Sequence, residues 1–267
     1  MTADLRNEIF KALADRRFTA DLRVTTPGVI CGVEVAQKKA GDIGCEVLHC
    51  GADGDEADTE TPILTLRGSA KAIAMAEDCI PGAIGKPSGI ARAMRRAQQL
   101  AGNRVRVVSG AAKKLPVEIK DQIRRAVHRG GGSGRISNEP FLYLDKNYVR
   151  MFGSVRKTLE AVAPMKGYVR AIQLRGLVED IATETRSALE LGAEILMVDS
   201  GRLEDLDLVA RLVRDAGRRG QTTIAFAGDI GMDEISAIAA HDVDILDIGR
   251  AILDAPIVDI KFDVRAE

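Results

Sequence analysis

The sequence predicts an α/β protein made of a small α+β domain followed by a larger domain of parallel strands and helices. From about Val105 onward, short β-rich runs alternate with segments of helical spacing, at a repeat of roughly 25 residues. Before that point, β-formers come in runs of three to five separated by Gly, Pro and Asp, as in a small antiparallel sheet. We therefore expect one domain at 1–103 and a second at 104–267. The extreme C-terminus is free in this scheme to pack back on the first domain.

In the first domain we expect a helix at Leu5–Ala14, then short strands, then a strand that leads into a helix within residues 62–79. A helix around Ser88–Ala101 would connect the domains, with Ser88 as its N-cap and Gly102 just past its end. The acidic stretch Asp53–Glu60 is interpreted as a solvated hairpin loop, because it lacks the spacing of a calcium-binding loop.

In the second domain the β-rich runs are apolar on both faces, as expected for strands buried beneath helices. The spacing between them fits strands joined by crossovers, and apolar residues between Leu203 and Val213 recur at helical spacing. A β/α barrel and a doubly wound sheet both fit this pattern. The runs are 105–109, 141–145, 168–174, 193–200, 222–229 and 243–250.

Composition excludes several classes of protein. The 38 Lys and Arg residues nearly balance the 39 Asp and Glu residues, and aromatic residues make up 3% with no Trp, so a nucleic-acid binder is not expected. No run approaches the roughly 20 apolar residues of a membrane span, and the N-terminal residues lack the apolar core of a signal peptide. The four cysteines match no zinc spacing and are interpreted as reduced, mostly buried thiols. A cytoplasmic location is expected.

Charged and polar residues follow the end of each β-rich run. In parallel β/α folds the ligand lies at the carboxyl ends of the strands, so these residues predict a mouth that binds an ionic ligand, although a generic solvated rim is the alternative. They are Ser109 with Lys113 and Lys114, Asp145 with Lys146 and Asn147, Arg175, Asp199 with Ser200, Gly228 with Asp229, and Gly249 with Arg250.

Two of these positions are suited to phosphate. Gly228-Asp229 and Gly249-Arg250 form turns that lead toward helices, where backbone N–H groups can approach an anion, although both glycines are also explained by tight turns alone. Arg135, at the end of the glycine-rich run 124–135, is either an anion ligand or a plain surface residue. Asp199 ends an apolar strand and is the best carboxylate for acid–base chemistry, with capping of the next helix together with Ser200 as its alternative role.

The order of motifs resembles the quinolinate phosphoribosyltransferases, also called carboxylating nicotinate-nucleotide pyrophosphorylases. The most specific matches are the SGIA segment at Ser88, the glycine-rich turn at Gly130, the strand that ends at Asp199, and the APIVDIKFD tail. This resemblance covers nearly the whole chain. It implies an N-terminal α/β sandwich domain, an incomplete β/α barrel, a homodimer in which one subunit's small domain completes the other's barrel mouth, and transfer of ribose 5-phosphate from phosphoribosyl pyrophosphate with Mg²⁺.

The chain departs from the family at its working positions. Lys113 matches the family's lysine, but Ala112 replaces an arginine, Gly134 replaces a histidine before Arg135, and Asp145 occupies a lysine position with Lys146 shifted by one. Gln173 and Arg175 stand where the family has a pair of glutamates, and Asp78 stands where the family has a basic residue after Ala-Glu. Quinolinate is a dianion, so these losses argue against it as the substrate.

The resulting hypothesis is a phosphoribosyltransferase-like enzyme that acts on an anionic or phosphorylated substrate other than quinolinate. In it Lys113, Asp199 and Lys146 are catalytic, Asp199 also binds Mg²⁺, and Lys114, Arg135, Asn147 and Arg175 bind substrate. Gly228, Asp229, Gly249 and Arg250 hold the phosphate. The alternatives are a lyase, decarboxylase or aldolase that uses a strand-end lysine, and a non-catalytic ligand-binding relative.

Overall fold

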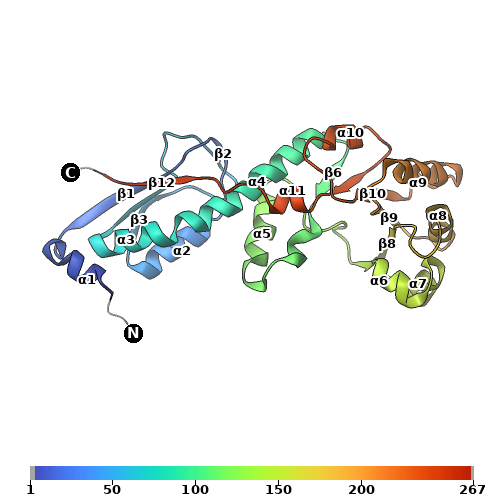
Figure 1. Ribbon diagram of the computed structural model, residues 1–267, viewed down its shortest axis with the longest axis horizontal. Helices are drawn as coiled ribbons and strands as arrows, with labels where there is room; N and C mark the ends of the chain where they lie inside the picture. The colour runs from blue at the N-terminus through green and yellow to red at the C-terminus, as the bar shows by residue number, and fades with distance from the viewer. Residues whose placement is uncertain (1–3, 266–267) are drawn as a thin grey trace. The chain divides into compact units, whose positions relative to one another are not determined.

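The computed structural model describes residues 4–265, and the chain forms two compact units (Figure 1). The first unit runs to Arg95 and also takes in Leu115–Gly131 and the segment from Asp254. The second unit comprises Arg96–Lys114 and Gly132–Leu253. Each unit is therefore built from separate stretches of sequence, and residues 115–131 cluster with the first unit rather than with the barrel that surrounds them in sequence.

The first unit is built on an antiparallel sheet whose strand order, over the described residues, is β12-β1-β5-β3. Ala20 of β1 lies opposite Val264 of β12 on one side and Leu66 of β5 on the other. A separate short ribbon pairs β2 with β4. The strands are β1 (Arg17–Val24), β2 (Gly28–Val29), β3 (Glu46–Cys50), β4 (Glu56–Ala57), β5 (Leu64–Ser69) and β12 (Ile260–Val264).

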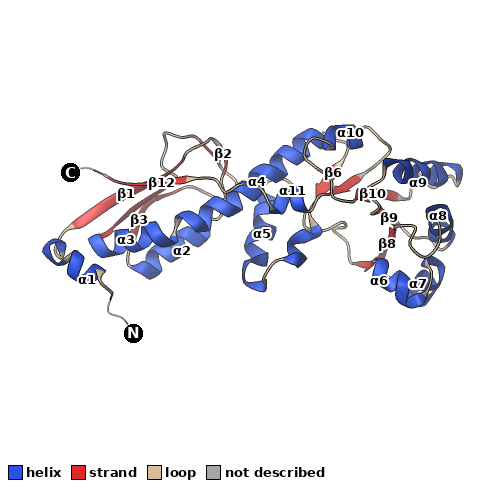
Figure 2. Cartoon of the chain, viewed as in Figure 1, coloured by secondary structure: helices blue, strands red, loops and turns tan. Residues whose placement is uncertain are grey.

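Helices cover one face of this sheet, where Ala20, Leu22, Leu64 and Leu66 form the core with apolar residues of the helices (Figure 2). Because side chains alternate along a strand, the intervening residues point to the other face. The helices of the unit are α1 (Arg6–Ile9), the 3₁₀ turn η1 (Lys11–Leu13), α2 (Val33–Ile43), α3 (Ala70–Cys79), α4 (Pro81–Ala101, which continues into the second unit) and α5 (Val117–Arg129).

Local signals predicted some of these boundaries and missed others. Ser69 caps α3 by accepting a hydrogen bond from the N–H of Ala72, at 3.2 Å. Ser88, expected to be an N-cap, instead lies inside α4, where it is fully buried and its hydroxyl accepts the N–H of Cys31 at 3.0 Å. The expected helix at Leu5–Ala14 is also wrong, since it divides into α1 and η1 around Phe10.

The acidic stretch contains one buried carboxylate rather than being solvated throughout. Asp53 is 8% exposed and accepts the N–H of Val33, the first residue of α2, at 2.7 Å. Asp53 thus does the capping that the N-cap residue Gly32 cannot do, because Gly32 has no side chain. In the glycine-rich run, a Cβ at Gly130 would stand 2.4 Å from the carbonyl oxygen of Ala91, so the backbone there passes close to α4.

The second unit contains the predicted parallel sheet. Over the described residues its order is β6-β11-β10-β9-β8-β7, and neighbouring strands pair in parallel throughout, as in a barrel left open between β7 and β6. Each β-rich run of the sequence contains one of its strands, so this part of the fold prediction is confirmed. The strands are β6 (Arg106–Val108), β7 (Phe141–Leu144), β8 (Val169–Leu174), β9 (Ile195–Val198), β10 (Thr223–Ala227) and β11 (Ile245–Asp247).

One side of these strands forms an interior apolar layer that includes Ala171, Met197, Ala225 and Ile245. Helices follow the strands in sequence and flank them (Figure 2). They are η2 (Gly110–Lys114), α6 (Lys146–Phe152), α7 (Val155–Val162), α8 (Ile181–Glu190), α9 (Leu203–Asp215), α10 (Ile235–Ala239) and α11 (Arg250–Leu253). Within residues 4–265, none of the helices has the length and apolar character needed to cross a bilayer.

Asp21 holds β12 to β1 from the face of the sheet away from the helices. Its carboxylate accepts two hydrogen bonds from Arg265, each 2.9 Å, and one from Thr65 at 2.8 Å, while Arg23 approaches to 3.1 Å. The bond with Arg265 is the main reason why the pKa of Asp21 falls to about 2, against the cost of burial. The C-terminal strand is therefore tied to β1 by charge as well as by its backbone ladder.

We expect Asp21→Asn to lower the free energy of unfolding by about 2 kcal/mol at pH 7. Since the folded pKa lies below the unfolded value, this stability is present above about pH 4 and is lost as the pH falls toward 2. Urea unfolding at pH 7 and pH 3 measures it, and the difference from the unsubstituted protein should roughly halve at pH 3. Asp263→Asn is the matched control, because Asp263 lies opposite Asp21 but is half exposed, 3.4 Å from Lys261. Equal losses for the two variants would contradict the assignment.

Candidate functional site

The polar layer of the candidate site continues the inward face of the barrel strands. Ala171, Met197 and Ile245 belong to the interior apolar layer. Because side chains alternate along a strand, the residues two positions later, Gln173, Asp199 and Asp247, point to the same side, nearer the carboxyl ends of their strands. Tyr143 packs against this layer from β7. Gln173 and Asp247 lie within strands β8 and β11, and Asp199 directly follows β9. The site is therefore a polar ring above an apolar barrel floor.

Asp199 is the centre of a hydrogen-bonded network. Gln173 Nε2 donates to its Oδ2, and Arg175 Nη1 lies 3.3 Å from the same oxygen. The Oε1 atom of Gln173 accepts the backbone N–H of Lys146 at 2.7 Å, so β7, β8 and β9 are linked through side chains. Burial raises the pKa of the Asp199 carboxyl, while the charges of Arg175, Lys146 and Lys113 oppose that shift. Asp199 is thus a partly buried carboxylate whose ionised form is favoured by the nearby cations.

Asp247 is a second carboxylate at the same end of the barrel. Its Oδ1 accepts the backbone N–H of Gly110 at 3.1 Å. Burial is the largest cause that raises the pKa of Asp247, and the negative charge of Asp199 raises it further, while Lys113 and Lys114 act in the opposite direction. The two carboxylates therefore sense one another across the barrel, and the lysines of η2 offset part of that repulsion.

Tyr143 lies among these acids. Burial raises the pKa of its phenol, and the charges of Asp247, Asp199 and Asp145 raise it further because they disfavour a phenolate. The hydroxyl is consequently protonated at neutral pH and is available as a hydrogen-bond donor at the floor of the mouth.

The remaining predicted strand-end residues have mixed roles. Asp145 is the N-cap of α6 and accepts the backbone N–H of Asn147 at 2.8 Å, so its carboxylate serves the helix. Arg175 is held by its backbone as well, because Glu184 of α8, only 2% exposed, accepts the N–H groups of Arg175 and Gly176 at 2.8 and 2.9 Å. The guanidinium of Arg135 lies 5.3 Å from the ring of Phe141, at the amino end of β7 rather than the end that carries Asp199.

The two glycine turns differ from one another. Gly228 has φ +131°, and a Cβ there would stand 2.3 Å from the Cα of Gly201, so β9 and β10 can come together at their ends only without that side chain. The turn does not run directly into a helix as expected, since α10 begins only at Ile235. Gly249 does precede α11 directly, but this helix has only four residues. Arg250 forms an ion pair with Asp229, both exposed. Phosphate binding at these turns remains a prediction.

Asp199 does not cap the following helix. The N-cap of α9 is Arg202, whose guanidinium bonds Asp205 at 2.8 and 2.9 Å. The alternative role for Asp199 is therefore wrong, which leaves its carboxylate facing Gln173 and Arg175.

The residues that sequence reasoning overlooked are Tyr143, Asp247 and Glu184. Tyr143 and Asp247 lie within their strands, whereas the site was predicted from the residues near the end of each β-rich run. An alternation count from Ala171, Met197 and Ile245 would have found the inward positions. Glu184 had no such signal, because its position on α8 is typical of any helical glutamate.

The fold and the site together define an α/β protein with a small antiparallel-sheet unit and an open parallel β/α barrel that has charged groups at the carboxyl ends of its strands. Two family models match: quinolinate phosphoribosyl transferase, N-terminal domain, over residues 4–88, and its C-terminal domain over residues 90–263. The chain belongs to the quinolinate phosphoribosyltransferase family.

Relatives match along almost their full length. The chain is 26% identical over 261 residues to a probable carboxylating nicotinate-nucleotide pyrophosphorylase of Methanothermobacter thermautotrophicus, covering 96% of this chain and 92% of the relative. A protein of the same description from Archaeoglobus fulgidus is 27% identical, with 89% and 90% covered. The solved nicotinate-nucleotide pyrophosphorylase of Francisella tularensis has the same fold, at a TM-score of 0.82 and 22% identity, with 99% and 91% covered.

We expect Gly228→Ala to lower the free energy of unfolding by about 2–4 kcal/mol, from backbone strain at positive φ and overpacking against Gly201. Gly249→Ala is the control, since its Cβ would meet only the Cβ of Ala111 at 3.4 Å, and it should cost less than about 1 kcal/mol. Urea titration of both variants measures the difference. Two equal values would show that the approach of Gly201 and Gly228 is not a constraint.

We expect Asp247→Asn to raise the unfolding midpoint at pH 7. The folded pKa of Asp247 is higher than normal, so its ionisation opposes folding as the pH rises, and an amide removes that charge while its oxygen can still accept from Gly110. Thermal unfolding at pH 4, near the ordinary pKa of an aspartate, and at pH 7 should show the larger gain at pH 7. A lower midpoint at both values would contradict this assignment of the buried charge.

Proposed function

We propose that this protein transfers a phosphoribosyl group from phosphoribosyl pyrophosphate to an anionic acceptor other than quinolinate, as a homodimer. The observation that carries the proposal is the pairing of Asp199 with Asp247 at one end of the barrel, within the field of Lys113, Lys114, Lys146 and Arg175. Membership of the family supports the reaction class. A mouth with both signs of charge suits a donor that has an anionic pyrophosphate and a ribose that becomes positive as it reacts.

Asp199 and Asp247 suit Mg²⁺ as the cation that accompanies the donor. Their carboxylates are hard oxygen ligands, and both have raised pKa values that a cation would relieve. Within residues 4–265 no group of three or more His, Cys, Asp and Glu side chains is arranged to hold a metal. Mg²⁺ commonly uses one or two carboxylates, with water and substrate phosphates as its other ligands, and when bound it would offset the charge of the pyrophosphate.

The protein's own contribution is orientation and charge. As the bond between ribose C1 and the pyrophosphate oxygen breaks and the bond to the acceptor forms, C1 gains positive character, which the anionic carboxylate of Asp199 stabilises. Lys113 and Lys146 compensate the negative charge of the departing pyrophosphate and of the acceptor. The Tyr143 hydroxyl would donate a hydrogen bond to the bound substrate from the inner face of the barrel. Arg175, whose backbone is held by Glu184, orients the Asp199 carboxylate.

The charge balance argues for an acceptor with less negative charge than quinolinate. Ala112, Gly134 and Asp145 stand where the resembling family has an arginine, a histidine and a lysine. Of the cations that remain, Arg175 is paired with Asp199 and Arg250 with Asp229. Each unit charge that lacks a counter-charge at about 4 Å is worth on the order of 4 kcal/mol at an effective dielectric constant near 20, so a dianion would be poorly held.

We expect phosphoribosyl pyrophosphate with Mg²⁺ to bind, and Asp199→Asn to lower the rate of pyrophosphate release at least 100-fold. Asp215→Asn, on the exposed end of α9, should leave the rate unchanged. Calorimetry measures binding, and a coupled pyrophosphate assay compares quinolinate with a panel of monocarboxylate and phosphorylated acceptors. Absence of binding at millimolar donor would overturn the proposal, and quinolinate as the best acceptor would overturn its specificity.

Borohydride treatment of the protein mixed with a panel of carbonyl compounds distinguishes the lyase alternative from phosphoribosyl transfer. A mass adduct on Lys113 or Lys146 would indicate a Schiff base, which a phosphoribosyl transfer does not form.

A further inference from the structure

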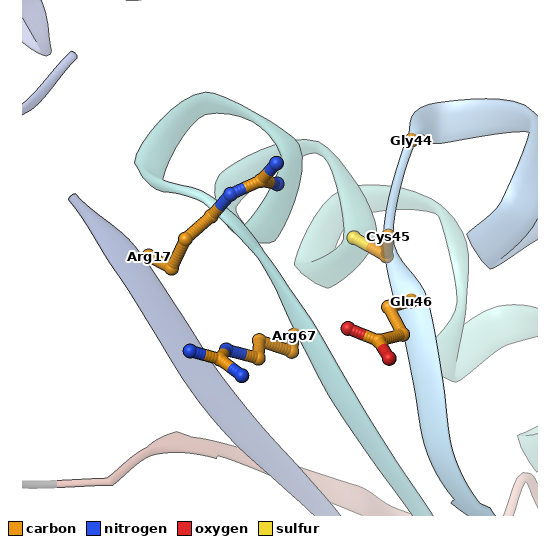
Figure 3. Close-up of a pocket in the computed structure, with 5 residues that line it drawn as sticks. All are labelled: Arg17, Gly44, Cys45, Glu46 and Arg67. Carbon is orange, nitrogen blue, oxygen red and sulfur yellow. The ribbon is translucent and has the colours of Figure 1, made fainter. Parts of the chain in front are cut away.

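The antiparallel sheet of the first unit carries a hollow of about 410 Å³ that the barrel chemistry does not use. It is lined by Arg17 of β1, Arg67 of β5, Glu46 at the start of β3, and Gly44 and Cys45 just before that strand. Figure 3 shows the two arginines on neighbouring strands, with Glu46 on the next strand and its carboxylate turned toward β5. Its volume is within the range of sites for small ligands.

Strand register places the three charged groups on the face away from the helices. Arg17 lies opposite Ser69, Thr19 lies opposite Arg67, and Glu46 lies opposite Arg67 on the other side. Arg17 and Arg67 alternate with core residues such as Leu66, so their side chains lie on the same face of the sheet as Asp21. They are therefore diagonal neighbours on one face, and both side chains line the same hollow, although their guanidinium groups extend in different directions (Figure 3).

Within residues 4–265, the charged side chains that line the hollow are not paired with one another. Among the described residues, neither Arg17 nor Arg67 has an ion pair or side-chain hydrogen bond, and Glu46 has none either. Two other arginines on the same face, Arg23 and Arg265, differ in being bound by Asp21 at 3.1 and 2.9 Å. Among the described residues, this face of the sheet thus contains one cluster whose arginines are paired with a carboxylate and one whose arginines are not.

We propose that this hollow binds the phosphate group of a small hydroxylated phosphate monoester. Two guanidinium forks match the oxygens of a phosphate dianion, which would also remove the repulsion between the two cations. Glu46 repels a second negative group and accepts hydrogen bonds from hydroxyls, so it favours a sugar or polyol attached to the phosphate. The ligand class is distinct from a pyrophosphate, whose additional charge Glu46 opposes.

Arginine labelling tests this residue by residue. Phenylglyoxal modifies exposed arginines, and peptide mass spectrometry resolves Arg17, Arg67 and the control Arg186, which is exposed on α8. We expect 5 mM glycerol 3-phosphate to slow labelling of Arg17 and Arg67 at least fivefold, with a smaller effect of inorganic phosphate and none of glycerol. Arg186 should label at one rate throughout.

Two variants complete the test. Arg17→Gln/Arg67→Gln should remove a glycerol 3-phosphate binding event in calorimetry, which Arg186→Gln retains, and Glu46→Gln should strengthen inorganic phosphate binding about fivefold and abolish the preference for the ester. Unchanged labelling of Arg17 and Arg67, or no labelling of either in the free protein, would overturn the site. Equal protection by phosphate and ester would overturn the ester. Since none of these readouts depends on turnover, their failure is separate from failure of the phosphoribosyl transfer.

Discussion

A carboxylate that is largely withdrawn from water yet kept as an anion sets the constraint that the barrel must meet. Burial alone would favour the neutral form of Asp199, and the charges of Arg175, Lys146 and Lys113 counteract it. Those cations act only if three strands and their following turns hold register. Gln173 links them directly, because it donates to Asp199 and accepts from the backbone of Lys146. The pairing of the strands is thereby coupled to the charge state of the site.

This constraint explains why a buried glutamate stands behind the site. Arg175 follows the end of β8, where a free turn would let its long side chain leave Asp199 for solvent. Glu184 prevents that by accepting the N–H groups of Arg175 and Gly176. Burial raises the pKa of Glu184, and these same backbone donors oppose the rise. A residue that touches no reacting atom therefore contributes to the electrostatics of the site through the conformation of one turn.

Sequence reasoning succeeded where a local pattern and the tertiary fold agree. The barrel strands were predictable because runs such as Ile195–Val198 are apolar throughout and buried on both faces. Asp199, Lys146 and Arg175 were found because they end such runs. Asp247 and Tyr143 were missed because their chemistry lies within the strand, where the same letters would be read as core. Ser88 failed for the opposite reason: its capping signal is local, but α4 continues through it because Cys31 provides its hydrogen-bond partner.

Charged side chains recur throughout this chain, and their partners distinguish structural from chemical roles. Asp21 is fully used, since Arg265, Arg23 and Thr65 occupy its oxygens, and its lowered pKa measures that satisfaction. Asp199 is partly used, because its partners leave it with a raised pKa and hence with residual affinity for a cation. Arg17 and Arg67 are at the other extreme, because neither has an ion pair or a side-chain hydrogen bond among the residues the structure describes. β1 thus contains both cases, since Asp21 is bound on every side while Arg17 near the start of the same strand is unpaired among the described residues, and an anion between Arg17 and Arg67 would reduce the repulsion between two like charges on one sheet face.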